Sequence, residues 1–165
     1  MERKYKVLVI DDYPDILKAL ESLLTFEGYE VLTRQDPDAG IRAATEWEPD
    51  VILLDVSMPG KSGIEVMMEI RSLPLVSDVP VVFLSAVSEE DVVVQALKGA
   101  DDYILKPFKC LELVARLEKA LKRAESAGPR VGAEVPDRLA VQSGEDTLLV
   151  PLEEVIFIEA AGKYT

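Results

Sequence analysis

Val51-Ile52-Leu53-Leu54-Asp55 is a run of four apolar side chains that ends on a carboxylate. A continuous apolar run of this kind is typical of a parallel strand that is buried on both faces of its sheet. Ligands of open parallel sheets bind beyond the carboxyl ends of the strands, so polar residues there are candidates for chemistry. Three further runs end in the same way: residues 7–10 lead into Asp11 and Asp12, residues 81–84 into Ser85, and residues 103–105 into Lys106.

Strand and helix patterns alternate five times over residues 1–125. Strands are predicted at residues 5–10, 30–35, 51–55, 80–85 and 102–105. The first helix is predicted from an apolar stripe within residues 16–24, and its end is marked by Gly28. Further helices are predicted to begin at Asp36-Pro37 and at Ser88, and to span residues 63–73 and 109–125. The last helix is expected to bury Leu111, Val114, Leu117 and Leu121. Such alternation implies a doubly wound α/β fold with a five-stranded parallel sheet and helices on both faces.

The composition excludes several classes of function. The 165 residues carry a formal net charge of −13, which is unlike a basic footprint for nucleic acid. The sequence has no histidine, which excludes a phosphohistidine, a Ser–His pair and a histidine metal site within it. The single cysteine, Cys110, is expected to be packed in a helix and favours a reducing compartment. Since no segment has a transmembrane or signal-peptide pattern, the expected location is cytoplasmic, with no membrane partner.

The composition changes after residue 125. Residues 126–136 hold two glycines and two prolines, so a linker is predicted there. Strands are then predicted at residues 139–142 and 147–150, as a hairpin around a turn at 143–146, and at residues 155–158. Three short strands cannot bury a useful core alone. We therefore expect residues 1–125 to form one domain and residues 137–165 to be the β-rich beginning of another, in a fragment of a longer protein.

The polar strand ends favour phosphoryl chemistry. A carboxylate such as Asp55 can take a phosphoryl group as an acyl phosphate. Three neighbouring carboxylates are costly to ionise unless a cation lies among them, and Mg²⁺ suits such an oxygen-rich site. Lys106 supplies a positive charge and Ser85 a hydroxyl donor for phosphoryl oxygens. Each residue taken alone also fits a simpler role, as a helix cap, a turn residue or a surface charge.

These residues belong to a longer set of motifs: Asp11-Asp12, Asp55-Val56-Ser57-Met58-Pro59-Gly60, Ser85-Ala86, Gly99-Ala100-Asp101-Asp102-Tyr103 and Lys106-Pro107-Phe108. Over residues 4–125 the set closely resembles the receiver domain of bacterial two-component response regulators. The resemblance implies a flavodoxin-like sheet in the strand order 2-1-3-4-5. It also implies a signalling switch that catalyses only its own phosphorylation and dephosphorylation, and not an enzyme with an external substrate.

The resemblance assigns a role to each site residue. Asp55 would be the phospho-acceptor, served by a partner sensor histidine kinase. Asp12, Asp55 and the backbone carbonyl of Ser57 would ligate Mg²⁺ (or Mn²⁺) directly, and Asp11 would act through water. The remaining roles concern the switch: Ser85 would be the switch hydroxyl, Tyr103 the aromatic switch, Lys106 the phosphate ligand, and Pro107 a cis-proline. A receiver homodimer is expected on phosphorylation.

The tail carries a second resemblance. Residues 139–142 and 150–160, together with Tyr164, look like the opening of a LytTR-type DNA-binding domain. The base-reading segments of such a domain would lie beyond Thr165, so DNA is expected to bind through the complete output domain and not through these residues. An alternative is a stand-alone receiver that signals through protein contacts. A phosphatase of the aspartyl-phosphate class is disfavoured, because Ser57 stands where its second aspartate is needed.

Overall fold

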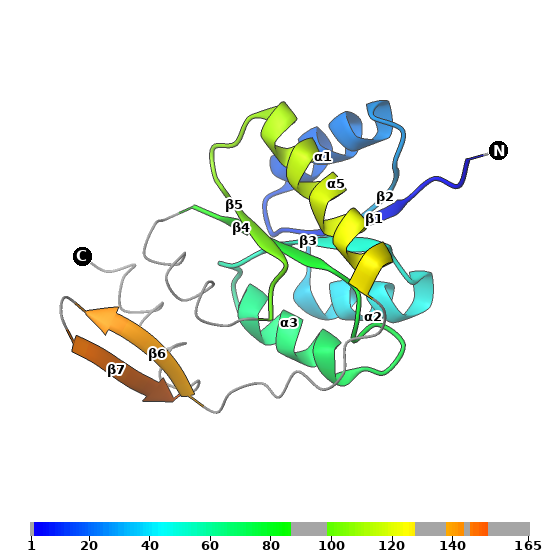
Figure 1. Ribbon diagram of the computed structural model, residues 1–165. Helices are drawn as coiled ribbons and strands as arrows, with labels where there is room; N and C mark the ends of the chain where they lie inside the picture. The colour runs from blue at the N-terminus through cyan, green and yellow to red at the C-terminus, as the bar shows by residue number, and fades with distance from the viewer. Residues whose placement is uncertain (1, 87–98, 128–137, 144–145, 152–165) are drawn as a thin grey trace.

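The computed structural model describes residues 2–86, 99–127, 138–143 and 146–151 (Figure 1). Five parallel strands form one sheet in the order β2-β1-β3-β4-β5. Their bounds are β1 (Lys6–Ile10), β2 (Glu30–Arg34), β3 (Val51–Asp55), β4 (Val81–Ser85) and β5 (Asp102–Leu105). The predicted fold class and strand order are confirmed, and every strand lies within one residue of its predicted ends.

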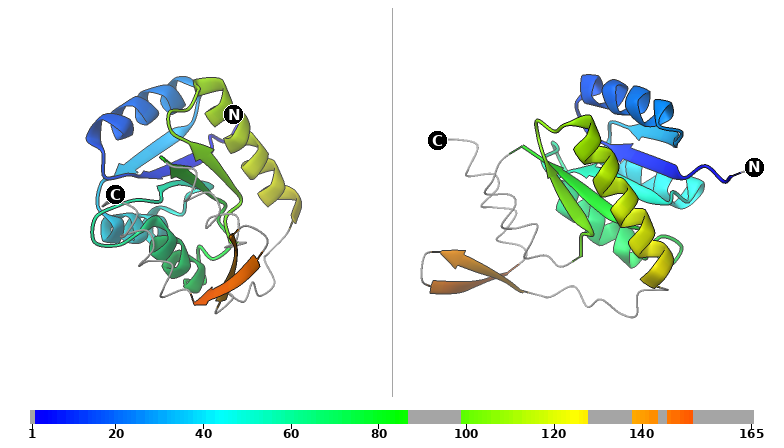
Figure 2. Two further views of the ribbon diagram at one scale, coloured as in Figure 1. Left: turned by 90° about the vertical axis from the view of Figure 1, so that its left-hand side faces the viewer. Right: turned by 45° about the horizontal axis from the view of Figure 1, so that its top comes forward.

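Helices cover both faces of this sheet. They are α1 (Pro14–Phe26), α2 (Pro37–Trp47), α3 (Gly63–Ser72) and α5 (Cys110–Ala127). Figures 1 and 2 show α1 and α5 on one face and α2 and α3 on the other. A hydrophobic core lies on each face of the sheet, and alternate residues of β3 contribute to the two. Ile52 and Leu54 pack with residues of α2 and α3, and Val51 and Leu53 pack with residues of α1 and α5. This division follows from the period of two in a strand.

Local signals set where α2 and α3 begin. The Asp36 carboxylate accepts a hydrogen bond from the Ala39 N–H at 2.8 Å, and Pro37 follows it at the first helical position. Helix α3 starts with a capping box, in which Ser62 and Glu65 each bond to the other's backbone N–H. These caps satisfy N–H groups that a helix start leaves without partners. The caps thus fix where α2 begins after β2 and where α3 begins after β3.

Helix α5 turns a different side to the core than the sequence predicted. Leu111, expected in the core, is 86% exposed, while Leu113 is fully buried. Leu113, Leu117 and Leu121 follow a spacing of four and form the stripe that faces the sheet. Leu111 lies about 200° around the helix from Leu113, so it projects away from the core. Cys110 at the first position is exposed, so the expectation of a packed thiol was wrong.

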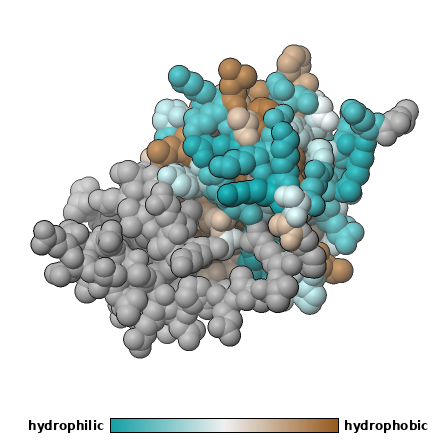
Figure 3. Space-filling view, viewed as in Figure 1, coloured by the Kyte–Doolittle hydropathy of each residue, from teal (hydrophilic) through white to brown (hydrophobic). Residues whose placement is uncertain are grey.

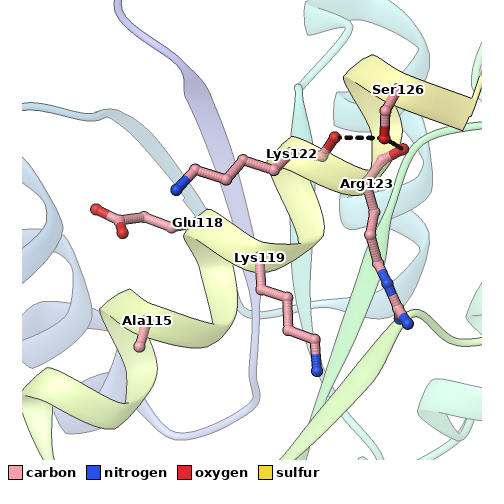
Figure 4. A pocket seen from close by; sticks show the side chains of 6 residues that line it. All are labelled: Ala115, Glu118, Lys119, Lys122, Arg123 and Ser126. Atoms are coloured by element: carbon pink, nitrogen blue, oxygen red, sulfur yellow. Dashed lines mark hydrogen bonds between the residues drawn. The ribbon is translucent and has the colours of Figure 1, made fainter.

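Helix α5 also continues two residues into the predicted linker. Its last turn includes Ser126, whose hydroxyl donates to the carbonyls of Lys122 and Arg123 at 3.0 and 3.2 Å (Figure 4). Ala127, the last helical residue, has high helix propensity. The helix end expected at residue 125 was therefore two residues early. The outward side of α5 is mostly hydrophilic (Figure 3), with Leu111 at its start as an exposed apolar residue.

The tail contains the predicted hairpin. Strands β6 (Arg138–Ser143) and β7 (Asp146–Pro151) pair antiparallel, with Leu139 opposite Val150. The helix expected from Ser88 and the strand expected at residues 155–158 lie outside the described residues. Among the helices that the structure does describe, none is both long and apolar enough to cross a lipid bilayer.

Candidate functional site

Three carboxylates meet at the carboxyl ends of β1 and β3. Asp11, Asp12 and Asp55 each offer an oxygen, and these atoms lie within 4.8 Å of one another. The strand register explains the meeting, because Ile10 pairs with Leu54, which places the next residue of each strand side by side. Asp11 is fully buried and Asp55 is 4% exposed. The cluster therefore holds two of its three acidic groups away from solvent.

Lys106 brings a positive charge to this cluster from the end of β5. Its Nζ lies 2.8 Å from Asp11 Oδ2 and 3.4 Å from Asp55 Oδ1. Its backbone N–H donates to the Ser85 carbonyl at 2.6 Å, which ties the end of β5 to the end of β4. The peptide bond between Lys106 and Pro107 is cis, the geometry that the resemblance implied. One ammonium group thus bridges two of the three carboxylates.

Hydrogen bonds within the β1–α1 turn and to the end of β2 hold this turn. The Tyr13 N–H donates to Asp11 Oδ1 at 2.9 Å, and the Asp11 N–H donates to the Arg34 carbonyl at 3.2 Å. The Gln35 side-chain amide donates to the Asp12 carbonyl at 3.1 Å. The sequence reading did not single out Gln35. Its place directly after β2, the neighbour of β1, is the signal that could have found it.

The loop after Asp55 is shaped by a close backbone contact. The Ser57 N–H donates to Asp55 Oδ1 at 3.3 Å, and the Gly63 N–H donates to the Val56 carbonyl at 2.8 Å. A Cβ atom at Gly63 would lie 2.1 Å from the Asp55 carbonyl oxygen. Only glycine therefore lets the start of α3 approach the end of β3 so closely. Gly63 is a second site-shaping residue that sequence reasoning did not identify.

The two expected switch residues lie on adjacent strands. Ser85 ends β4 and is fully buried, and β4 pairs directly with β3, where Asp55 lies opposite Leu84. Tyr103, on β5, lies opposite Phe83 of β4 and is partly buried against the core beneath α2 and α3. The structure thus brings Ser85 to the same sheet edge as Asp55 and Lys106, whereas Tyr103 lies three residues before Lys106, in the body of β5.

Burial and neighbouring charge raise the pKa of Asp55 to about 7. Desolvation is the main cause and the Asp11 charge the second, while Lys106 opposes both. Burial lowers the pKa of Lys106, but its hydrogen bond and charge interactions with Asp11 and Asp55 outweigh this, and the net shift is upward. A cluster of hard oxygen donors whose ionisation is disfavoured fits a divalent cation such as Mg²⁺.

A shallow depression of about 410 Å³ lies elsewhere, on α5 (Figure 4). It is lined by Ala115, Glu118, Lys119, Lys122, Arg123 and Ser126. None of these residues belongs to the acidic cluster, and all come from one face of one helix. The strand-end cluster, not this depression, is therefore the candidate site.

We expect the metal-free protein to lose stability as the pH rises from about 4 to about 7. The pKa of Asp55 is raised in the folded state, so the folded chain binds more protons than the unfolded chain in this window. Asp55→Asn should remove this dependence and raise the free energy of unfolding by about 2–4 kcal/mol near pH 8. Urea unfolding in a chelator near pH 5 and pH 8 measures both. If Asp55→Asn raised the free energy of unfolding equally at the two pH values, the raised pKa of Asp55 would be contradicted.

Comparisons with known proteins point to one family. Residues 7–118 match the family described as response regulator receiver domain. The transcriptional regulatory protein PrrA of Mycobacterium tuberculosis is 41% identical over 159 residues, covering 90% of this chain and 67% of PrrA. The DNA-binding response regulator MtrA of Mycolicibacterium smegmatis is 36% identical over 167 residues, covering 97% of this chain and 72% of MtrA. Neither name mentions a LytTR domain.

A solved structure shows the same fold. The crystal structure of a response regulator receiver domain protein from Clostridium thermocellum matches with a TM-score of 0.67 and 31% sequence identity. The match covers 73% of this chain and 97% of that one. Nearly all of that protein therefore has a counterpart in this chain.

Proposed function

The chain belongs to the response regulator receiver domain family, and we propose on this basis that Asp55 is its phospho-acceptor, charged by a partner sensor histidine kinase. The observation that carries the proposal is the buried Asp55 carboxylate, which shares its site with two further carboxylates and has Lys106 Nζ at 3.4 Å. The relatives named above are transcriptional and DNA-binding regulators, which supports a transcriptional output.

In this proposal Asp12, Asp55 and the Ser57 carbonyl hold Mg²⁺ (or Mn²⁺), and Asp11 acts through water. The ion would neutralise charge on the transferring phosphoryl group and lower the cost of ionising the cluster. Asp55 presents a carboxylate oxygen to the phosphorus, a P–O bond forms, and the bond from phosphorus to the donor nitrogen breaks with its electron pair going to the donor. A donor imidazole must come from the partner, since this sequence has no histidine.

Lys106 and Ser85 would hold the phosphoryl oxygens after transfer. The Lys106 ammonium already lies between Asp11 and Asp55, so a new oxygen on Asp55 would find a cation within reach. The Ser85 hydroxyl, from the neighbouring strand, would donate to another oxygen. Tyr103, on the strand beside Ser85, would then pack inward and carry the change to the surface that partners read, including a second receiver in a homodimer.

The phosphorylation test uses the full chain with acetyl phosphate and Mg²⁺. We expect one added phosphoryl group by intact-mass spectrometry, mapped by peptide analysis to the segment that contains Asp55. A chelator should prevent the modification, because three carboxylates and a phosphoryl group cannot share the site without a cation. Modification at another residue, or equal modification in the chelator, would overturn the site assignment.

The output domain is the second part of the proposal. The resemblance of residues 139–142 and 150–160 is the support for a LytTR-type output domain. A transcriptional output is also supported by PrrA and MtrA, whose alignments cover 90% and 97% of the chain and so continue past α5. The alternative of a stand-alone receiver acting through protein contacts requires no DNA-binding domain after residue 165. The single cysteine supports a cytoplasmic location.

We expect residues 1–165 to bind DNA weakly and without sequence preference, with a dissociation constant of about 10⁻⁴ M or weaker at physiological salt. The physical reason is the net charge of −13, which opposes approach to phosphates. A gel-shift titration with a random and a promoter-derived duplex measures this. Tight, sequence-specific binding by these residues alone would show that the base-reading elements are already present.

A further inference from the structure

A buried arginine joins three segments at the amino-terminal ends of β4 and β5. The Arg71 side chain, in the last turn of α3, is 9% exposed. Its Nη1 donates to the carbonyls of Ser77 and Val79 at 3.0 and 2.5 Å. Its Nη2 donates to the Gly99 carbonyl at 3.0 Å and contacts Asp101 Oδ2 at 3.4 Å. We refer to Arg71, Asp101 and these three carbonyls as the Arg71 network.

Asp101 extends this network into the sheet itself. Its Oδ2 accepts the Val81 N–H at 2.9 Å, and its own N–H donates to the Val81 carbonyl at 2.9 Å. Val81 is the first residue of β4, and Asp101 directly precedes β5. The pair therefore fixes which residue of β5 lies opposite which residue of β4.

This contact matters because β5 buries little apolar surface that could set its register. It is an edge strand of four residues, and only Ile104 among them is fully buried. Register is strongly specified where one face of a strand is buried and weakly specified otherwise. The Arg71 network lies where the pairing of β4 and β5 begins. It can therefore set the register that the few apolar residues of β5 do not set.

The register so fixed has its functional consequence at the other end of the strands. Val82 lies opposite Asp102 and Ser85 opposite Leu105, so the next residue, Lys106, emerges beside Ser85. The Lys106 N–H to Ser85 carbonyl bond closes the ladder there. A shift of one residue would move the Lys106 side chain by about 3.3 Å and reverse its face. The carboxylates proposed to bind the metal lie at the ends of β1 and β3 and would not move with it.

We propose that Arg71 is a positioning residue for phosphoryl transfer: it locks the register of β5 on β4 and thereby places Lys106 beside Asp55. The inference rests on the proposed role of Lys106 in holding the phosphoryl group. It assigns Arg71 no contact with the reacting atoms, because every contact described for it lies at the far ends of the strands.

The test compares the full chain with Arg71→Met by three measurements. Mg²⁺ affinity, from calorimetric titration, should change less than about twofold, since the carboxylates belong to other strands. The initial rate of phosphorylation by acetyl phosphate at saturating Mg²⁺ should fall about tenfold or more, because misplacement by about 1 Å can cost a hundredfold. Amide hydrogen exchange at Asp101 and Lys106 should become faster. A folded variant with wild-type rate and wild-type exchange would overturn the proposal.

Arg116→Met is the matched control. Arg116 pairs with Asp102, the first residue of β5, at 2.8 Å, but the Arg116 side chain is 37% exposed and lies on α5. Its loss should leave the phosphorylation rate and the Lys106 exchange unchanged, and an effect equal to that of Arg71→Met would overturn the special role of the buried network. Should Arg71→Met fail to fold, Asp101→Asn keeps an acceptor for the Val81 N–H while weakening the ion pair, and the same three measurements apply.

The exchange measurement separates this inference from the proposed function. If the wild-type chain takes no phosphoryl group, the proposed function fails, whereas faster exchange at Lys106 in Arg71→Met still supports the register lock. If the wild-type chain is phosphorylated and the variant shows a slower rate together with weaker Mg²⁺ binding, the whole site is disturbed and the register proposal is overturned.

Discussion

Asp55→Asn should abolish labelling by acetyl phosphate and Mg²⁺, a loss of at least about a thousandfold in rate. The amide nitrogen and oxygen cannot form an acyl phosphate, because the nucleophile of this chemistry is the carboxylate. The variant should nonetheless fold, since Asp55 is 4% exposed and its charge is disfavoured there. Intact-mass spectrometry over a time course measures the loss. Retained labelling in the variant would remove Asp55 from the role proposed for it.

Asp15→Asn is the matched control for that experiment. Asp15 lies in the first turn of α1, close in sequence to the acidic cluster, but it is exposed and makes no contact with Asp55 in the described hydrogen bonds and ion pairs. Its substitution also removes one negative charge while leaving the cluster intact. We expect labelling of this variant at the wild-type rate, which separates the loss of a nucleophile from the loss of a charge.

Gly63→Ala should destabilise the chain by about 3 kcal/mol or more. The added Cβ would lie 2.1 Å from the Asp55 carbonyl oxygen and 2.8 Å from the Val56 Cα, and backbone atoms cannot move aside as a flexible side chain can. Since the displaced carbonyl belongs to Asp55, Mg²⁺ affinity should fall together with stability. Urea unfolding and calorimetric Mg²⁺ titration measure the two effects.

Gly60→Ala provides the comparison. Gly60 has a φ of 85°, but a Cβ there would meet no atom within 4 Å. The expected cost is that of a left-handed conformation alone, about 1–2 kcal/mol. Mg²⁺ affinity should change little, because no backbone atom of Asp55 is displaced. Equal losses of Mg²⁺ affinity in both variants would show that the loop as a whole, and not the close contact at Gly63, shapes the site.

The strand ends were predictable because their signal is local. Each buried strand is a continuous apolar run, and the residue after it is known once the run is seen. The Arg71 network was not predictable in this way. Nothing near Arg71 in the sequence indicates that its guanidinium meets carbonyls of Val79 and Gly99, since those contacts form only when α3 and two loops come together. Gly63 was hidden for the same reason, because its constraint is a tertiary approach.

The phase of α5 shows a different limit of sequence reading. Leu117 and Leu121 fit both the predicted stripe through Leu111 and the observed stripe through Leu113. Helical periodicity alone does not choose between two apolar positions near the start of a helix. The choice depends on how the helix docks on the sheet, where Leu113 packs in the same core as Val82 and Ile104.

Lys106 gives the protein an internal counter-ion. Its ammonium contacts Asp11 at 2.8 Å and Asp55 at 3.4 Å, so the folded chain offsets part of the negative charge of its own acidic cluster. Without a divalent ion, this contact opposes the burial and the Asp11 charge that raise the pKa of Asp55. A chain that lacked this ammonium would depend more strongly on a bound divalent ion for its stability near neutral pH.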